Sequence, residues 1–357
     1  MTLSFGEFIA ALSKNPPLQI TTFLLLGVIL VNGWTDAPNA IASLVASGGM
    51  ELKKAVRMAA VFNFAGLALM TGWNATVAFT IYHIADFGNS PQKALTALCA
   101  ALVAIIIWSA AAWSFGIPTS ESHALIAGLT GAAISIHSGL AGVHGREWIK
   151  VLYGLLFSSF SGFGLGWAGG KILTWGSGKR DGKYRGEKGK RCRDWASRLQ
   201  IAGAAAMAFM HGAQDGQKFM GVFLIGIFLA EGKAQAGNFC IPLWMTAVCS
   251  IVMAMGTAIG GERIIKTVGE DMVKLGRSQG IVSDAAAAVC LLFASLMGAP
   301  VSTTHVKTTA IMGVGLAANA RAVDRTIVRE MILAWVITFP CCCGIGYGVT
   351  EIFLKLV

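Results

Sequence analysis

The stretch NGWTDAPN at residues 32–39 returns in altered form as HGAQDGQK at residues 211–218. Both stretches contain Gly-x-x-Asp, and both lie inside apolar sequence. Along the chain, 179 positions separate Asp36 from Asp215. A carboxylate at the same place in two apolar segments indicates a duplicated unit.

A second motif repeats at nearly the same offset. The first half has PTSESH at residues 118–123, and the second half has PVSTTH at residues 300–305, 182 positions later. Two different motifs recur in the same order and at nearly one spacing. This pattern predicts one structural unit built twice.

The composition indicates a polytopic membrane protein. Hydrophobic residues make up 55% of the chain and charged residues 13%, whereas soluble domains carry about 25% charged residues. The net charge of +10 comes from basic residues between the apolar segments, which favours a topology signal over nucleic-acid binding. The eight cysteines show no metal-binding spacing, so we interpret them as packing residues and expect no cofactor.

Ten apolar segments follow one another, five in each half, and most are long enough to cross a hydrocarbon core of about 30 Å as a helix. With an odd number of crossing segments in each half, the second half has the opposite orientation in the membrane. This is the inverted repeat common among secondary transporters. We therefore expect an all-α membrane protein with a first repeat at residues 1–176, a basic loop at 177–198 and a second, inverted repeat at 199–357. The segments are 20–47, 54–83, 93–115, 119–137, 147–176, 199–229, 239–260, 281–298, 302–320 and 327–355.

The basic residues set the expected orientation. If every segment crosses once and the 177–198 loop is cytoplasmic, nineteen Lys and Arg residues lie inside and six lie outside. Basic residues gather on the cytoplasmic side of membrane proteins. The sequence thus predicts a multi-pass protein of the cell membrane (plasma or inner membrane) with both termini outside. The basic loop is then mainly a topology anchor, with binding of anionic lipid or a partner as the alternative.

Asp36 and Asp215 are the candidate cation-coupling residues. A charge inside an apolar segment is costly and is often functional. Amide neighbours (Asn39, Gln214 and Gln217) and nearby glycines suit an unwound helix whose free carbonyls face a cavity. Such a site could bind Na⁺ at Asp36 and Asp215, or the carboxylates could carry a proton. The alternative is a pair of buried aspartates satisfied by hydrogen bonds between helices.

The Pro-x-Ser-x-Ser/Thr-His motif is typical of a helix start, because proline suits the first turn and hydroxyls cap free N–H groups. Helix N-termini bind anions. In an inverted repeat, two such helices starting near the middle of the membrane would both point at one central oxyanion. The alternative is two capped helices that start at the membrane surfaces. The candidate anion ligands are Thr119, Ser120, Glu121, Ser122, Ser302, Thr303, Thr304 and Lys307.

Two histidines follow the hydroxyls. His123 and His305 could donate to the anion or relay a proton, or each could bond a neighbouring carbonyl. A hydrolase built from Ser122, His123 and Asp36 is disfavoured, because adjacent Ser and His side chains do not easily align as nucleophile and base. We therefore expect no enzyme.

Three charged residues break the symmetry between the halves. Lys218 stands where the first half has Asn39, and we expect it to neutralise Asp215 three residues away. Glu121 repels an anion unless it is protonated, bound to a cation or paired. We hypothesise that Glu121 pairs with Lys307 across the repeat interface or carries the coupling proton.

At these residues the chain resembles the inorganic phosphate transporter (PiT) family, which includes sulfate permeases. The resemblance spans nearly the whole chain and is strongest at residues 211–218 and 300–305. It implies re-entrant helix starts whose hydroxyls hold phosphate, and two aspartates that handle the coupling cation, Na⁺ or H⁺. Departures from the family pattern bear on the coupling ion and on the choice between phosphate and sulfate. They are Thr35, Pro38, Glu121, Gln214 and Lys307.

The sequence thus predicts a secondary active transporter that imports inorganic phosphate with Na⁺ or H⁺ by alternating access. Sulfate is the alternative anion. The chain has no nucleotide-binding motif, so the expected energy source is an ion gradient. A channel would instead show no dependence of accumulation on such a gradient. Expected partners are phosphate and the lipid bilayer, without nucleic acid, and a homodimer is compatible with the sequence.

Overall fold

The computed structural model describes residues 4–115, 119–177, 187–232, 240–259, 265–268, 272–273, 275–319 and 323–356. Within these ranges the chain is helical, and strand pairing is limited to isolated bridges, Ala85 with Val143 and Val273 with Val323. The all-α expectation is confirmed. The helices are α1 (Phe5–Lys14), α2 (Pro16–Thr35), η1 (Ala37–Ile41), α3 (Ala42–Ala46), α4 (Leu52–Trp73), α5 (Thr76–Tyr82), α6 (Pro91–Ser114), α7 (Glu121–His137), η2 (Leu140–Gly142), α8 (Gly145–Ser177), α9 (Glu187–Ala230), α10 (Leu243–Ile259), α12 (Arg277–Leu296), α13 (Thr303–Ala318) and α14 (Arg325–Leu354).

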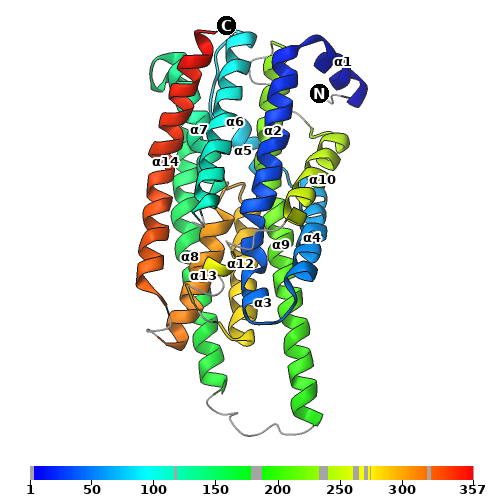
Figure 1. Ribbon diagram of the computed structural model, residues 1–357, viewed down its shortest axis with the longest axis vertical. Coiled ribbons are helices and arrows are strands. Elements are labelled where there is room, and N and C mark those ends of the chain that lie inside the picture. Colours follow the sequence, from blue (N-terminus) through cyan, green and yellow to red (C-terminus); the bar gives the residue numbers. More distant parts are fainter. Residues whose placement is uncertain are drawn as a thin grey trace.

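The chain runs back and forth along the long axis of the molecule (Figure 1). The first helix and the C-terminal end of α14 lie at one end, and the end of α8 and the start of α9 lie at the other. The described chain therefore begins and ends at one end of the molecule, opposite the end of α8 and the start of α9. An odd number of passages in each half predicts this arrangement.

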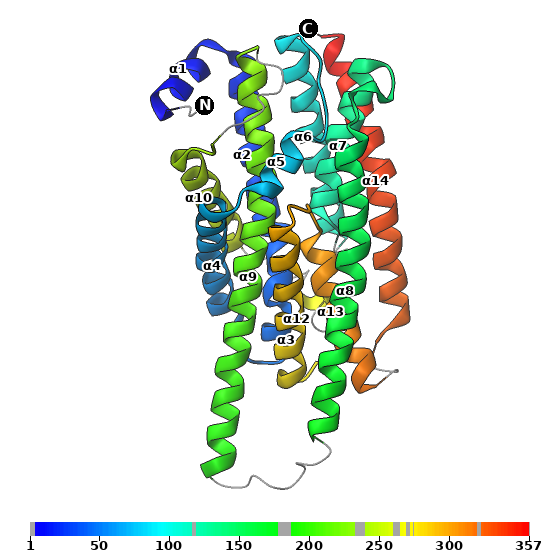
Figure 2. The same ribbon diagram turned by 180° about the vertical axis from the view of Figure 1, so that it is seen from behind.

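Two helical hairpins enter from opposite ends and meet near the middle (Figure 1, Figure 2). From the end with the termini, α6 runs inward and α7 returns; from the other end, α12 runs inward and α13 returns. The expectation that every segment crosses once therefore does not hold for these four helices. The charge tally is unchanged, because the hairpin connectors 116–118 and 299–301 contain no charged residue.

The contacts between helices follow the duplication. Helix α7 packs on α14 as α13 packs on α8, and α2 packs on α10 as α9 packs on α4. In the same way, α6 contacts α2 and α14, and α12 contacts α9 and α8. Exchanging each helix for its counterpart in the other half thus reproduces the packing, which supports an inverted repeat.

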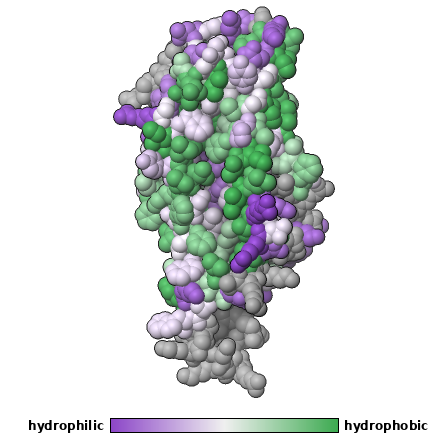
Figure 3. Space-filling model, turned by 90° about the vertical axis from the view of Figure 1, so that its left-hand side faces the viewer, coloured by the Kyte–Doolittle hydropathy of each residue, from purple (hydrophilic) through white to green (hydrophobic). Residues whose placement is uncertain are grey.

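Among the described residues, six stretches of helix are long and apolar enough to cross a membrane. Apolar side chains cover the middle of the face shown in Figure 3, and hydrophilic side chains gather toward the end that carries the termini. Exposed aromatic and aliphatic residues on α8 and α14 contribute to the apolar surface. The six stretches are Pro16–Ala46, Leu52–Trp73, Pro91–Ser114, Gly145–Trp175, Arg277–Leu296 and Arg325–Leu354.

A proline decides where the first long helix breaks. Helix α2 ends at Thr35, Asp36 caps it, and η1 follows with Pro38 in its first turn. Proline lacks an N–H and its ring clashes with the carbonyl four residues earlier, which disfavours a continuous α2 at this point. The matching position of the second half is Gln217, and α9 runs unbroken through Asp215. The expected unwinding is therefore confirmed at Asp36 and wrong at Asp215.

Residues 187–198 of the predicted basic loop are helical. Helix α9 already begins at Glu187 and continues for 44 residues, while residues 178–186 lie outside the described part of the chain. At a rise of about 1.5 Å per residue, α9 is long enough to cross a membrane and extend beyond it.

The glycines of the two Gly-x-x-Asp motifs allow close helix crossings. A Cβ atom at Gly33 of α2 would overlap the backbone of α10 at Met253, and one at Gly212 of α9 would overlap the backbone of α4 at Asn63. Small residues at such crossings bring backbones together. Each glycine therefore allows a neighbouring helix to approach closely three residues before the aspartate.

Candidate functional site

Each hairpin places a capped helix start near the middle of the molecule (Figure 1). The Ser120 hydroxyl accepts the His123 N–H at 3.2 Å, and the Ser302 hydroxyl accepts the His305 N–H at 3.2 Å. The first N–H groups of a helix have no acceptor within it, and the helix dipole makes this end positive. The two predicted helix starts are confirmed, and α7 and α13 run away from the middle in opposite directions. Pro118 lies outside the described residues.

Asp36 is buried and is held by neutral donors. Its Oδ1 accepts the Asn39 amide N–H at 2.9 Å and the Thr304 hydroxyl. Its Oδ2 lies 3.4 Å from the Thr303 hydroxyl. The expected place of Asn39 beside Asp36 is thus found, and two hydroxyls of α13 reach a carboxylate of the first half.

Asp215 is buried and is held by charged and neutral donors. Its Oδ1 lies 2.6 Å from the Lys218 ammonium, so the expected pair three residues apart is formed. Its Oδ2 lies 3.3 Å from His211 Nε2 and 3.4 Å from the Asn32 amide. The Ser122 hydroxyl of α7 lies 3.5 Å from Oδ1.

Hydroxyls of the helix starts tie the two halves together. Ser122 of the first half reaches Asp215 of the second, and Thr304 of the second half reaches Asp36 of the first. Thr303 also lies 3.2 Å from Asp215 and therefore contacts both aspartates. Members of the predicted anion site (Ser122, Thr303 and Thr304) and the two aspartates of the predicted cation site thus form one buried cluster.

Glu121 adds a third carboxylate to this cluster. It is 2% exposed and its Oε1 accepts a hydrogen bond from the Thr35 hydroxyl. Its Oε2 has no hydrogen-bond partner among the described residues. The Thr35 hydroxyl also lies 2.8 Å from the Val31 carbonyl, so its single proton is shared between two acceptors.

The hypothesised pair of Glu121 with Lys307 is wrong. The Lys307 ammonium binds Asp284 Oδ1 and lies 3.1 Å from the Ser43 hydroxyl. Asp284 and Lys307 are both 0% exposed and belong to the same hairpin, on α12 and α13. Sequence reasoning missed Asp284. A single aspartate in one apolar segment and a single lysine in the next were the available signal.

The two aspartates and one histidine can together hold a cation. Asp36, His211 and Asp215 each offer a ligand atom, and these atoms all lie within 4.8 Å of one another. His211 was not among the expected ligands, although it occupies the position that Asn32 holds in the first half. A hard cation takes carboxylate and other oxygen ligands, so the carboxylates of this group suit Na⁺ as well as a proton.

Two expected cation ligands direct their amides elsewhere. The Gln214 amide N–H donates to Ser295 Oγ at 3.0 Å and to the Ala299 carbonyl at 3.3 Å. The Gln217 amide N–H donates to the Asn74 carbonyl at 2.7 Å. Both side chains therefore link α9 to neighbouring chain segments.

The two histidines lie against each other and against aromatic rings. The ring centroids of His123 and His305 are 4.5 Å apart, and each ring also contacts an aromatic residue of α14, Phe339 or Trp335. The Nδ1 atoms of both histidines lack partners among the described residues. The histidine pair thus joins the two helix starts, which the duplication could have indicated.

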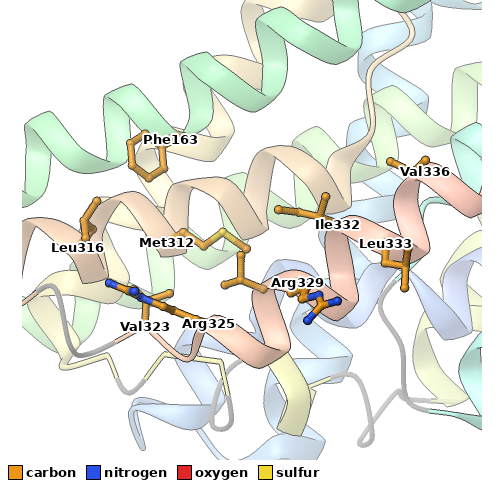
Figure 4. A pocket seen from close by; sticks show the side chains of 10 residues that line it. Phe163, Met312, Leu316, Val323, Arg325, Arg329, Ile332, Leu333 and Val336 are labelled. Atoms are coloured by element: carbon orange, nitrogen blue, oxygen red, sulfur yellow. The ribbon is translucent and has the colours of Figure 1, made fainter.

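A cavity of about 570 Å³ lies apart from this cluster, between α8, α13 and α14 (Figure 4). Its lining is apolar except for Arg325 and Arg329. It shares no residue with the buried carboxylates or the helix starts, so we do not assign it to the anion.

Known proteins resemble this chain over nearly its whole length. The sequence model of the phosphate transporter family matches residues 32–346. A probable low-affinity inorganic phosphate transporter of Bacillus subtilis (strain 168) is 33% identical over 333 residues, covering 92% of this chain and 96% of that protein. A protein of the same description from Rhizobium meliloti (strain 1021) is 34% identical over 326 residues, covering 89% of this chain and 92% of that protein.

A solved structure has the same fold. The structure described as the sodium-dependent phosphate transporter superimposes with a TM-score of 0.84 at 20% identity. The match covers 96% of this chain and 100% of that chain. At this identity the likeness shows the fold alone.

Proposed function

The chain belongs to the phosphate transporter family, and on this premise we propose that it imports inorganic phosphate together with Na⁺ or H⁺. One observation carries the proposal. Two helix starts, which favour anions, meet from opposite ends at a buried group of carboxylates, which favour cations. An anion and a cation would therefore bind within one cluster.

The charges of the cluster explain why transport would be coupled. Asp36, Asp215 and Glu121 contribute three carboxylates, and Lys218 contributes one ammonium. Full ionisation would leave two uncompensated negative charges beside the anion site. Phosphate would be repelled unless Na⁺ or protons neutralised them. Cation binding would thus be a condition for anion binding, which is the basis of symport.

The carboxylates also favour phosphate over sulfate. Phosphate at neutral pH carries at least one P–OH group, which needs an acceptor, whereas sulfate carries none. Asp36 lies beside Thr303 and Thr304, and its carboxylate could accept a hydrogen bond from this P–OH group. Because the family resemblance includes sulfate permeases, sulfate symport remains the alternative.

The two hairpins supply a route for alternating access. Their tips hold the hydroxyls that contact the opposite half, so breaking the contacts of one tip opens the cluster toward one end. Residues 1–176 and 199–357 would then act as the two inverted repeats. The excess of basic residues supports an orientation with the α8–α9 connection in the cytoplasm and both termini outside.

Transport by purified protein in liposomes tests the proposal. Labelled phosphate and labelled sulfate would be supplied under a Na⁺ gradient alone and under a proton gradient alone. We expect phosphate to accumulate under at least one gradient and not with Asp215→Asn. Accumulation of sulfate alone would identify sulfate as the transported anion instead of phosphate. Accumulation of neither anion would refute the proposal.

A further inference from the structure

The Lys218 ammonium lies in a nest of oxygen atoms. It is 2.6 Å from Asp215 Oδ1 and 2.6 Å from Ser122 Oγ, and it also donates to the Val301 carbonyl. An ammonium has three N–H donors, and these three acceptors use all of them. Lys218 therefore has no donor left for a phosphate ion, and its side chain is 1% exposed.

The same oxygen atoms form the kind of site that a small cation takes. A carboxylate, a hydroxyl and a backbone carbonyl come from three separate elements: α9, the start of α7 and the connector before α13. Hard cations take these ligand types, and transporters build such sites near broken helices at the midplane. The ammonium thus occupies the space of a cation and satisfies its ligands.

The matching site of the first half has no such cation. Asn39 stands at the position of Lys218, and Asp36 receives hydrogen bonds only from neutral groups, Asn39, Thr303 and Thr304, among the described residues. One aspartate therefore has its charge balanced by the chain itself, and the other requires a cation from outside.

We propose that the Lys218 ammonium permanently fills one of two cation sites, so that each phosphate is accompanied by one external cation fewer than the ligand set could bind. This inference rests on the proposed function as a cation-coupled phosphate transporter. Removing the ammonium would leave Asp215, Ser122 and Val301 as an open site for Na⁺. A gain of Na⁺ binding on loss of a lysine is its specific consequence.

Lys218→Asn tests this consequence, because asparagine is the residue at the matching position of the first half. Wild type and variant would be placed in liposomes, and uptake of labelled Na⁺ and labelled phosphate would be measured together. We expect the variant to take up about one Na⁺ more per phosphate than wild type. An equal ratio in both proteins would overturn the inference.

A binding measurement covers the case in which the variant does not transport. The melting temperature of each detergent-purified protein would be followed as choline is replaced by Na⁺, since a ligand that binds only the folded state raises it. We expect a larger Na⁺-dependent rise for Lys218→Asn than for wild type. The double variant Asp215→Asn/Lys218→Met, which lacks the anchoring carboxylate, should lose this extra rise. Identical Na⁺ responses in wild type and Lys218→Asn would refute the proposed site.

The two proposals fail in different ways. Wild-type protein that accumulates no phosphate under any gradient would refute the transport function, and the Na⁺ response of the melting temperature would still decide the site. Wild-type protein that transports phosphate, together with a variant that shows no additional Na⁺, would refute only the role of Lys218.

Discussion

Asp36 and Asp215 occupy matching positions of a duplicated sequence, yet their surroundings differ. Asp36 sits at a helix break and receives hydrogen bonds from neutral groups. Asp215 sits inside an unbroken helix and contacts an ammonium and a histidine. Two substitutions account for most of this contrast: Pro38 opposite Gln217, and Asn39 opposite Lys218.

The difference indicates that the two matching aspartates of a duplicated site can have different roles. One carboxylate is already balanced by its own helix and holds the two hairpin tips together through Ser122 and Thr303. Under the proposed function, the other would respond to cations that arrive with the substrate. The following substitutions test this division, in order of their expected effect on stability.

Neutralising the balanced aspartate should have the largest effect. Asp215→Asn leaves the Lys218 ammonium buried without a counter-charge, and breaking a buried pair in this way costs about 3–5 kcal/mol. We expect a strongly lowered melting temperature and no phosphate uptake. The control Asp215→Asn/Lys218→Met should recover much of the stability but not the uptake. A single variant as stable as wild type would contradict the role of the pair.

Exchanging the residues at the helix break should act on one half only. Gln217→Pro would interrupt α9 and cost about 3 kcal/mol or more, because proline removes a helix hydrogen bond and clashes with the preceding turn. Pro38→Gln should change the melting temperature far less, since α2 is already broken there. Gln217→Ala controls for the lost amide contact with Asn74. Equal decreases in melting temperature for Gln217→Pro and Pro38→Gln would show that the proline does not cause the difference between the broken α2 and the unbroken α9.

Neutralising the unbalanced aspartate should separate function from stability. Asp36→Asn removes no ion pair, and its amide oxygen can still accept from Thr304, so we expect the stability to change by no more than about 1 kcal/mol. Phosphate uptake should nevertheless be lost under both gradients. Uptake and its cation dependence would be measured beside thermal melting. A loss of stability as large as that of Asp215→Asn would remove the distinction between the two sites.

The smallest effect on stability is expected at Glu121. The amide of Glu121→Gln still has an oxygen that can accept from Thr35, so the melting temperature should stay close to that of wild type. If Glu121 carries a coupling proton, wild-type uptake rises as the external pH falls, and uptake by the variant does not respond. Initial rates across a pH series give the comparison. A variant with the wild-type rate and pH response would exclude this role.

Much of the architecture could be predicted because it depends on local signals. The capped starts at Ser120 and Ser302 and the duplicated aspartates follow from residue types at fixed spacing. Pro38 also marks the end of α2, and its absence from the second half predicts an unbroken α9. The prediction of two unwound helices relied on the glycines near each aspartate rather than on the proline. Gly33 and Gly212 instead allow close helix crossings.

The pairing of the buried charges could not be predicted from the same signals. Lys307 binds Asp284 rather than Glu121, and this choice depends on how α12 folds back on α13. The roles of His211 and of the Val301 carbonyl likewise depend on which helices cross near Asp215. Spacing along one segment contains no information about these crossings.

The placement of the buried ion pairs bears on how the chain enters the membrane during synthesis. Lys218 has its counter-charge on the same helix, and Lys307 has its counter-charge on the same hairpin. An unpaired ammonium is expensive to move into hydrocarbon. Because each lysine travels with its own aspartate, the apolar part of α9 (residues 199–230) and that of the α12–α13 hairpin (residues 281–318) carry no net charge. Each can therefore insert without an uncompensated charge before the two halves of the protein meet.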